Sequence, residues 1–359
     1  MGRRKPTTPS VWDVPAVVAA FEAAGLKTLH LRPLLAWLLR HPDVRAWSDI
    51  SERRWAQEAH LRSVPAAARA LLRAEFAICS SRVEARDESA DGATTKLAVA
   101  LSDGLRVETV LMRHGSRTTV CVSSQVGCAM GCSFCATGTM GIVGDLTAGE
   151  IVEQLLHSRW AESEPSSGAA GTPAAAAAEA PPTAETPPTA ETPPAAPARP
   201  ARAAAASAST RVRNVVFMGM GEPLNNYRAV CAAVRLLTDP SHFGLRPSSV
   251  TVSTVGIVPR MRTFAADLPG VSLALSLHAP TQPKRESIMP AARAFPLERL
   301  LAALEAHMAA AKPHTPTSKV AMVEYIMLRD VNDTPEDACA LAALLAPHAT
   351  RLVSMPPPA

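Results

Sequence analysis

The sequence predicts an α/β fold in which a parallel sheet curls into a partial (β/α)6 barrel. From Thr118 onward, short stretches rich in β-branched residues alternate with longer segments of helical periodicity, which is the order that βαβ units produce. A second observation is that 47% of the 359 residues are hydrophobic, enough for a large core and a smaller attached domain. The sixth strand is expected to be incomplete, because only residues 351–354 resemble one before the final prolines.

Charge and composition exclude some classes of protein and leave others open. The formal net charge is +4, which suits an RNA partner and an ordinary soluble protein equally well. No stretch approaches the roughly 18 apolar residues of a membrane-spanning helix. The basic residues 1–6 are not followed by the apolar segment of a secretory signal. We therefore expect a cytoplasmic protein with no membrane partner, or alternatively one with an organelle transit peptide.

The residues before the barrel divide into two expected parts. Residues 1–78 carry apolar residues at helical spacing, which predicts a small helical N-terminal domain. Residues 79–117 hold two short apolar runs, 97–101 and 107–111, on either side of Asp103-Gly104. Because Asp-Gly is a favoured hairpin turn, this connector is expected to be a β-hairpin extension of the sheet.

The core barrel is expected over residues 118–354. A helix is predicted over residues 148–160, because Thr147 is a good N-cap and Glu150 completes a capping box. The first five strands are expected at 118–124, 214–218, 249–255, 271–277 and 319–327, and further helices at 227–238, 258–265, 297–311 and 335–345.

Residues 161–210 interrupt this alternation. They consist mostly of Ala, Pro, Thr and Ser, and the sequence PPTAET occurs twice in tandem. Such a composition cannot bury enough apolar surface to offset the entropy of ordering, so we predict a disordered insertion within the barrel. A barrel tolerates such an insertion, because each doubling of loop length costs only about 0.6 kcal/mol.

Three of the seven cysteines form the pattern C-x3-C-x2-C, at Cys128, Cys132 and Cys135. A secreted disulfide scaffold would be shorter and more evenly rich in cysteine, so a reducing compartment and a metal role are expected. Three close thiolates can bind three irons of a [4Fe–4S] cluster and leave the fourth iron open for S-adenosylmethionine (SAM). The alternatives are a zinc site, which usually needs a fourth ligand, and three buried thiols without a metal.

Four longer motifs carry a resemblance to a known family. They are RTTVCVSSQVGC at 117–128, VFMGMGEPLN at 216–225, ALSLHAP at 274–280 and VEYIML at 323–328. In this order they resemble the RlmN-type radical SAM methyltransferases, which modify carbon 2 of adenine in 23S ribosomal RNA and in some transfer RNAs. The helical residues 1–78 look like a diverged form of the RNA-contacting accessory domain of that family.

The resemblance implies cofactors, partners and site residues. The cofactors are a [4Fe–4S] cluster and SAM, and the partners are 23S rRNA, tRNA as a second substrate, and an electron donor such as flavodoxin or ferredoxin. It further implies a monomer, in the cytoplasm or in an organelle with bacterial-type ribosomes. The implied SAM-binding residues follow strands, where barrel sites lie: Gly221, Glu222, Ser253, Ser276, Leu277 and His278. Each of them alone has a structural alternative, as part of a turn or as a satisfied core group.

Two further residues match positions that have chemical roles in the family. Carbon 2 of adenine is electron-poor, and the family reaches it by carrying a methyl group on a cysteine sulfur. Cys121, seven residues before Cys128, matches the second cysteine, which releases the product by forming a disulfide with the carrier. Glu108 matches the acceptor of the carbon-2 proton. The alternatives are a small buried side chain for Cys121 and a solvent-facing strand residue for Glu108.

The carrier cysteine of the family lies beyond the sixth strand, and no cysteine of this sequence matches it. Cys339 lies in an expected helix, and Cys79 and Cys231 are expected to be structural thiols. The intact SAM motifs favour a sequence truncated from a complete enzyme. The alternatives are a short form that cleaves SAM without methylating RNA, a non-catalytic RNA-binding protein, and a radical SAM enzyme acting elsewhere, such as on adenine carbon 8.

Overall fold

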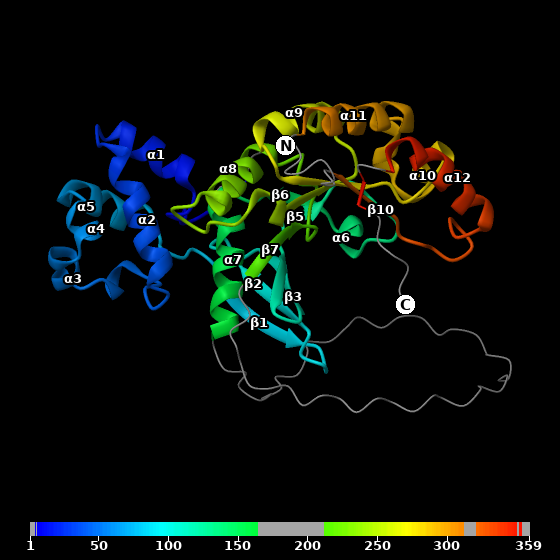
Figure 1. Ribbon diagram of the computed structural model, residues 1–359. Helices are drawn as coiled ribbons and strands as arrows, with labels where there is room; N and C mark the ends of the chain where they lie inside the picture. The colour runs from blue at the N-terminus through cyan, green and yellow to red at the C-terminus, as the bar shows by residue number, and fades with distance from the viewer. Residues whose placement is uncertain (1–3, 5, 164–211, 312–320, 350–351, 354–359) are drawn as a thin grey trace.

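The structure is a computed structural model that describes residues 4, 6–163, 212–311, 321–349 and 352–353 (Figure 1). A nine-stranded sheet runs in the order β1-β2-β3-β4-β7-β8-β9-β10-β11. From β4 onward all neighbours pair in parallel, which confirms the expected α/β fold with a large parallel sheet. The parallel strands are β4 (Arg117–Cys121), β7 (Val212–Phe217), β8 (Val250–Thr254), β9 (Ser272–Ser276), β10 (Ala321–Glu324) and β11 (Leu352–Val353).

Helices follow the parallel strands and also form a group of their own before the sheet (Figure 1). The group before the sheet contains α1 (Val14–Ala23), α2 (Leu31–Arg40), α3 (Glu52–Gln57), α4 (Ala59–Arg62) and α5 (Ala66–Glu75). The later helices are α6 (Ala136–Thr139), α7 (Ala148–Ser163), α8 (Tyr227–Thr238), α9 (Val258–Asp267), α10 (Gln282–Ile288), α11 (Leu297–Ala310) and α12 (Pro335–Leu345). None of these helices is long and apolar enough to cross a membrane.

The helices before the sheet form because their apolar residues repeat with the helical period. In α2 the buried residues Leu31, Leu34, Leu35 and Leu38 stand at positions i, i+3, i+4 and i+7, which makes one apolar face. This face belongs to the same hydrophobic core cluster as the side chains between the sheet and its helices. The helical region is therefore packed onto the sheet and its helices through one continuous core.

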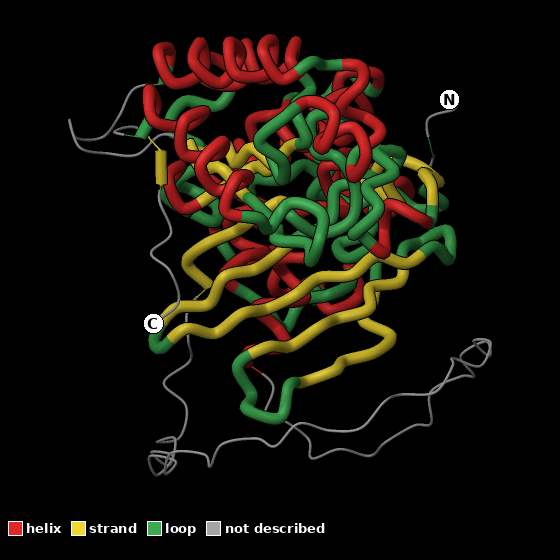
Figure 2. The backbone as a smooth tube through the Cα atoms, turned by 90° about the vertical axis from the view of Figure 1, so that its right-hand side faces the viewer, coloured by secondary structure: helices red, strands yellow, loops and turns green. Residues whose placement is uncertain are grey.

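The connector holds three antiparallel strands, where the sequence predicted a hairpin of two. β2 (Thr94–Ala100) and β3 (Arg106–His114) pair across the expected Asp103-Gly104 turn, and β3 pairs with β4. The missed strand, β1 (Arg82–Glu88), pairs with β2, and its side chains are almost all exposed. A strand that is exposed on both faces shows no apolar alternation, so the sequence contained no signal for it. Figure 2 shows these antiparallel strands side by side at one edge of the sheet.

A separate two-stranded sheet lies after β4. It consists of β5 (Gln125–Cys128) and β6 (Gly141–Asp145), which pair in antiparallel fashion around the cysteine loop. These two strands are not among those predicted from the sequence.

One predicted boundary differs from the structure, and some predicted segments lie outside the residues that the structure describes. Residues 161–163, which were expected in the insertion, continue α7 to Ser163, so the helix is longer than predicted. Residues 164–210 of the expected insertion lie outside the described residues, as do 319–320 of the fifth strand and 351 and 354 of the sixth.

α7 is buried almost throughout its length, because it lies between the sheet and the chain that leads into the first helices. On one side, Gln154 accepts a hydrogen bond at 2.9 Å from the Thr109 hydroxyl on β3. On another side, the Arg4 guanidinium donates to the Glu150 carboxylate at 2.6 and 2.9 Å. Buried polar groups are tolerated here because each has a partner.

The capping box at the start of α7 is confirmed, and its removal should destabilise the chain. The Glu150 N–H donates to Thr147 Oγ1 at 3.2 Å, and the Thr147 N–H donates to the Glu150 carboxylate at 2.9 Å. Thr147→Ala is expected to lower the free energy of unfolding by about 1 kcal/mol, because one N-terminal N–H of the helix loses its acceptor. Urea denaturation followed by circular dichroism measures this loss. The control Thr7→Ala, at an exposed residue, should change the free energy by less than about 0.5 kcal/mol.

Candidate functional site

The candidate site lies where the parallel strands end. Because β4 and β7 to β10 run in the same direction, their carboxyl ends meet at one edge of the sheet. Cys121 ends β4, Ser276 ends β9 and Glu324 ends β10. Ser253 is the penultimate residue of β8, and Glu222 follows β7. The fold thus brings to one edge residues that are far apart in the sequence.

The three cysteines of the C-x3-C-x2-C motif lie in a loop that begins at the end of β5. Gly127, just before the first cysteine, has a φ of +76°, and a Cβ there would lie 2.0 Å from the carbonyl oxygen of Gly141 on β6. Only glycine allows the two strands to approach so closely. Cys128 and Cys132 are buried, and Cys135 is half-buried at the start of α6.

Burial favours the protonated form of two of these thiols, Cys128 and Cys132. Burial raises the pKa of Cys132 to about 11, and the neighbouring Cys128 and Cys135 thiols act in the same direction. Burial likewise raises the pKa of Cys128, with a further contribution from the Glu222 carboxylate. Thiols in this setting become thiolates only with a compensating positive charge, such as bound metal, and metal binding then releases their protons.

The donor set of the loop fits an iron–sulfur cluster better than a zinc ion. All three cysteines are free thiols. Among the described residues, one set of three ligand atoms lies within 4.8 Å of one another, and it is formed by Cys79, Glu153 and His157. The three loop sulfurs are not all within this distance of one another. Thiolates that bind separate corners of a cube stand apart in this way.

Glu222 is fully buried and links the ends of β7 and β8. Its carboxylate accepts hydrogen bonds from the backbone N–H groups of Leu224 and Val255, both at 2.9 Å. Its own N–H donates to Gln125 Oε1 at 2.8 Å. Gly221 has a φ of +100°, and a Cβ there would lie 2.5 Å from the Cβ of Gln125, so glycine is required. Burial raises the pKa of Glu222 to about 7, and a nearby cation would favour its ionised form.

Ser253, Ser276 and Glu324 form a group of two hydroxyls and a carboxylate. The two serine Oγ atoms are 3.1 Å apart, and Glu324 Oε2 accepts from them at 3.3 and 3.5 Å. Burial raises the pKa of Glu324. Leu277, the residue after Ser276, is fully buried, and its N–H donates to the carbonyl oxygen of Glu324 at 3.1 Å. Sequence reasoning gave Glu324 no role, although a carboxylate that ends a parallel strand is itself a signal of a site.

His278 has an unusual backbone conformation that the surrounding contacts hold. Its φ is +58°, which is uncommon for a residue other than glycine. Asn332 Nδ2 donates to the His278 carbonyl oxygen at 2.6 Å, and the Ile326 N–H donates to the ring Nδ1 at 3.1 Å. Burial lowers the pKa of His278 to about 4, so the ring is neutral. It stands edge-on to Phe134 of the cysteine loop, with the ring centroids 4.9 Å apart.

Glu108 and Cys121 share one face of the sheet. Thr109 on β3 points to α7, so its neighbours Glu108 and Val110 point to the opposite face. Val110 on β3 pairs directly with Cys121 on the neighbouring strand β4. Glu108, two residues before Val110, therefore lies on the same face as Cys121 and diagonally opposite it. The Glu108 side chain is 56% exposed, and its carboxylate lies 3.5 Å from Lys96 Nζ. Burial raises the pKa of Cys121 to about 11, and the charge of the nearby Glu324 adds to the effect.

The group of Cys79, Glu153 and His157 is explained by a structural role. The Glu153 carboxylate accepts hydrogen bonds at 2.8 to 3.2 Å from the backbone and side chain of Ser80 and from the backbone of Ser81. Its acceptor capacity is thus used in tying the connector to α7. Burial raises the pKa of the Cys79 thiol and lowers that of His157 to about 4, so both are neutral.

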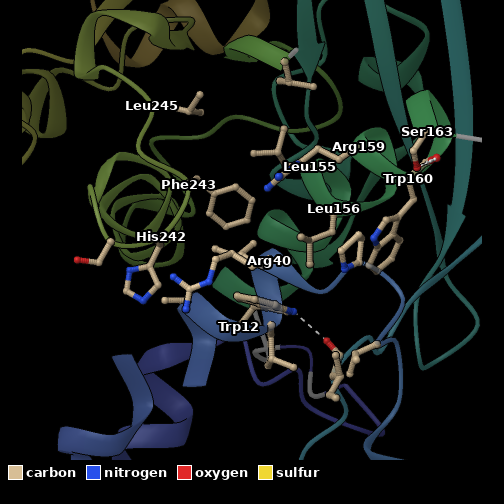
Figure 3. Close-up of a pocket in the computed structure, with 18 of the residues that line it drawn as sticks. Trp12, Arg40, Leu155, Leu156, Arg159, Trp160, Ser163, His242, Phe243 and Leu245 are labelled. Atoms are coloured by element: carbon tan, nitrogen blue, oxygen red, sulfur yellow. Dashed lines mark hydrogen bonds between the residues drawn. The ribbon is translucent and has the colours of Figure 1, made fainter. Parts of the chain in front are cut away.

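A cavity of about 730 Å³ lies in another part of the molecule (Figure 3). Residues of α2, α7 and the loop after α8 line it, among them Arg40, Trp160 and Phe243. The Trp12 indole at its edge donates to the carbonyl oxygen of Ile78 at 2.9 Å. None of the predicted site residues lines this cavity.

Both the sequence and the structure of this chain are similar to those of known proteins. No family model matches the chain. The "Probable dual-specificity RNA methyltransferase RlmN 2" of Opitutus terrae is 38% identical over 298 residues, which cover 82% of this chain and 66% of that protein. The "Probable dual-specificity RNA methyltransferase RlmN" of Roseiflexus sp. is 39% identical over 285 residues, which cover 79% and 67%. The chain thus spans about two thirds of the length of these curated relatives.

A solved structure agrees with these sequence matches. A radical SAM methyltransferase from Sphaerobacter thermophilus superposes with a TM-score of 0.71 at 29% sequence identity. The superposition covers 96% of this chain and 83% of that protein. The similarity therefore extends over almost the whole chain.

Proposed function

We propose the activity of this chain from one premise: it belongs to the RlmN family of dual-specificity RNA methyltransferases. The proposed activity is SAM-dependent methylation of carbon 2 of adenine in 23S rRNA, with tRNA as a second substrate. One observation supports it most strongly. A loop of three cysteines, a buried carboxylate and two hydroxyls meet at the edge of the sheet where the parallel strands end.

The cofactors would be held by residues from separate strand ends. Cys128, Cys132 and Cys135 would ligate a [4Fe–4S] cluster. The Glu222 carboxylate would accept from the ammonium of SAM, while Gly221, Ser253, Ser276, Leu277 and His278 would line the rest of the SAM pocket. When bound there and reduced by a donor such as flavodoxin or ferredoxin, these cofactors supply the one-electron cleavage of SAM to a 5′-deoxyadenosyl radical.

Other residues of the chain would bind the RNA and accept the proton from carbon 2 of the target adenine. A target adenine has to leave its stack to reach such a pocket. Glu108 is exposed on the same face as Cys121, so its carboxylate would accept the carbon-2 proton. Cys121 would release the product by forming a disulfide with the carrier cysteine, which the family places beyond the sixth strand. The helices α1 to α5 would contact the RNA backbone.

Anaerobic reconstitution tests the proposal on the chain itself. With iron and sulfide, the chain is expected to bind about four irons, and with dithionite and SAM it should release 5′-deoxyadenosine. For a second assay, the C-terminal segment of a relative, which contains the carrier cysteine, is fused to the end of this chain. Mass spectrometry of digested 23S rRNA should then detect 2-methyladenosine.

The possible outcomes separate the competing functions. Methylation at carbon 8 of adenine would assign the chain to a different radical SAM activity. RNA binding without any release of 5′-deoxyadenosine would indicate a non-catalytic RNA-binding protein. A chain that takes up no iron and sulfide would contradict the proposal at its first step.

A further inference from the structure

Arg285 on α10 is a buried cation without a carboxylate partner. The residue is 1% exposed, and it forms no ion pair with an Asp or Glu among the residues the structure describes. Burial lowers its pKa to about 10, so the guanidinium is still charged at neutral pH. A buried charge without an opposite charge is strongly destabilising. The fold therefore keeps a positive charge at this position although no described carboxylate balances it.

Two of the three guanidinium nitrogens bind the ends of strands. Arg285 Nε donates to the carbonyl oxygen of Leu277 at 3.2 Å. Nη2 donates to the carbonyl oxygen of Val255 and, at 3.4 Å, to that of Ser276. Arg285 thus ties together the segments after β8 and β9, next to the proposed SAM-binding serines. Carbonyl groups are neutral dipoles, so these bonds leave the net charge uncompensated.

The third guanidinium nitrogen has no partner. Nη1 of Arg285 is buried, and no hydrogen-bond acceptor for it exists among the described residues. Buried donors are almost always satisfied in native proteins, so an orphaned one calls for an explanation, such as a group that is bound only part of the time.

The cysteine loop lies against the helix that carries Arg285. The Ser133 N–H donates to the carbonyl oxygen of Ile288, the last residue of α10, at 2.9 Å. Cys132 packs with Ile288 and Met289 in a small apolar cluster. The hydrogen bond and the packing place the cysteine loop directly against the C-terminal end of α10. Once a bound cluster ionises the thiols of this loop, their negative charge would lie next to the helix that carries Arg285.

We propose that Arg285 is a positioning residue for the iron–sulfur cluster. Its guanidinium would balance the negative charge of the three cluster-bound thiolates, and its unpartnered Nη1–H would be available to donate to a sulfur atom of the cysteine loop. The inference rests on the proposed function, because the cluster supplies the negative charge. A cationic donor beside cluster sulfurs stabilises the reduced, more negative state, so Arg285 raises the reduction potential.

The first test measures the reduction potential of the reconstituted chain by titration monitored with electron paramagnetic resonance. Arg285→Gln is expected to shift the midpoint potential of the cluster to a more negative value, whereas Arg285→Lys should stay close to wild type. Arg293→Gln is the matched control, because Arg293 is exposed just beyond α10 and its loss changes the net charge equally. The control should leave the potential unchanged.

The second test compares the melting temperatures of the apo and cluster-loaded forms. Loading should raise the melting temperature of wild type more than that of Arg285→Gln, because the cluster adds the counter-charge that the apo form lacks. If Arg285 only tied strand ends together, Arg285→Gln would lower the melting temperatures of the apo and loaded forms equally and leave the reduction potential unchanged. That result would overturn the inference.

The remaining outcomes are also decisive. If neither Arg285→Gln nor the apolar Arg285→Met folds even as the apo chain, the residue belongs to the scaffold and the inference is wrong. A wild-type chain that takes up no cluster would overturn the proposed function itself. A loaded wild type with an unshifted Arg285→Gln potential would overturn only the role of Arg285.

Discussion

The variant Cys132→Ala is expected to lose reductive SAM cleavage by more than about 100-fold. Cys132 is the most deeply buried of the three loop cysteines and packs directly against the segment that follows β9. Two remaining thiolates cannot hold three corners of a cube, so the iron content should fall together with the activity. Iron and sulfide analysis after anaerobic reconstitution and chromatography of released 5′-deoxyadenosine measure the two effects.

Cys231→Ala provides the matched control. Cys231 is also a buried free thiol, but it lies on α8, within the helical layer. The variant should keep the iron content and SAM cleavage of wild type, at a small cost in stability. If Cys132→Ala retained wild-type iron and activity, the assignment of the loop cysteines as cluster ligands would be wrong.

The variant Glu222→Gln is expected to bind SAM about 10- to 150-fold more weakly, which corresponds to a loss of about 1.5–3 kcal/mol for a hydrogen bond to a charged group. The neutral amide preserves the size of the side chain but cannot pair with an ammonium. Equilibrium dialysis of SAM with the cluster-loaded chain measures the loss, and the iron content should stay constant. Glu298→Gln, at an exposed residue of α11, should leave SAM affinity unchanged.

The same carboxylate predicts how SAM affinity depends on pH. Burial raises the pKa of Glu222 to about 7, so SAM binding at lower pH requires the release of a proton. SAM affinity should therefore be about tenfold lower at pH 6 than at pH 8, and Glu222→Gln should abolish this dependence. Equal wild-type affinities at the two pH values would show that Glu222 does not face the ammonium.

The raised pKa of Glu222 also makes the stability of the apo chain depend on pH. Since the pKa of the folded state exceeds the unfolded value of 4.5, folding favours the protonated carboxyl. This contribution to stability is fully present below about pH 4.5 and is lost as the pH rises through about 7. Bound SAM should reverse the trend in this pH window, because it stabilises the ionised form.

Local patterns were sufficient to predict the parallel sheet, the cysteine motif and the cap of α7. Alternating strand and helix periods reflect which face of each element is buried, and this information lies within a few consecutive residues. The spacing of Cys128, Cys132 and Cys135 keeps the thiols close in any compact loop. The capping box between Thr147 and Glu150 needs contacts over one helical turn alone.

The family motifs predicted most residues of the candidate site. How these residues are arranged in space was seen only in the structure. The motifs pointed to Glu222, Ser253 and Ser276, whereas the hydrogen bond between Ser253 and Glu324 joins residues 71 positions apart. The shared face of Glu108 and Cys121 likewise follows from the pairing of β3 with β4. Strand periodicity indicates that a side chain alternates between faces, but it does not identify the strand that lies beside it.

The burial of Arg285 is the clearest example of a feature that neighbouring residues in the sequence do not predict. In the sequence Arg285 is one of three consecutive charged residues, Lys284, Arg285 and Glu286, typical of a solvated helix surface. In the structure the helix turns Arg285 inward, where its guanidinium meets carbonyl groups at the ends of two strands and lies beside the cysteine loop. Periodicity records which residues are apolar. The burial of a charge depends on which distant groups can bind it, and packing alone brings those groups together.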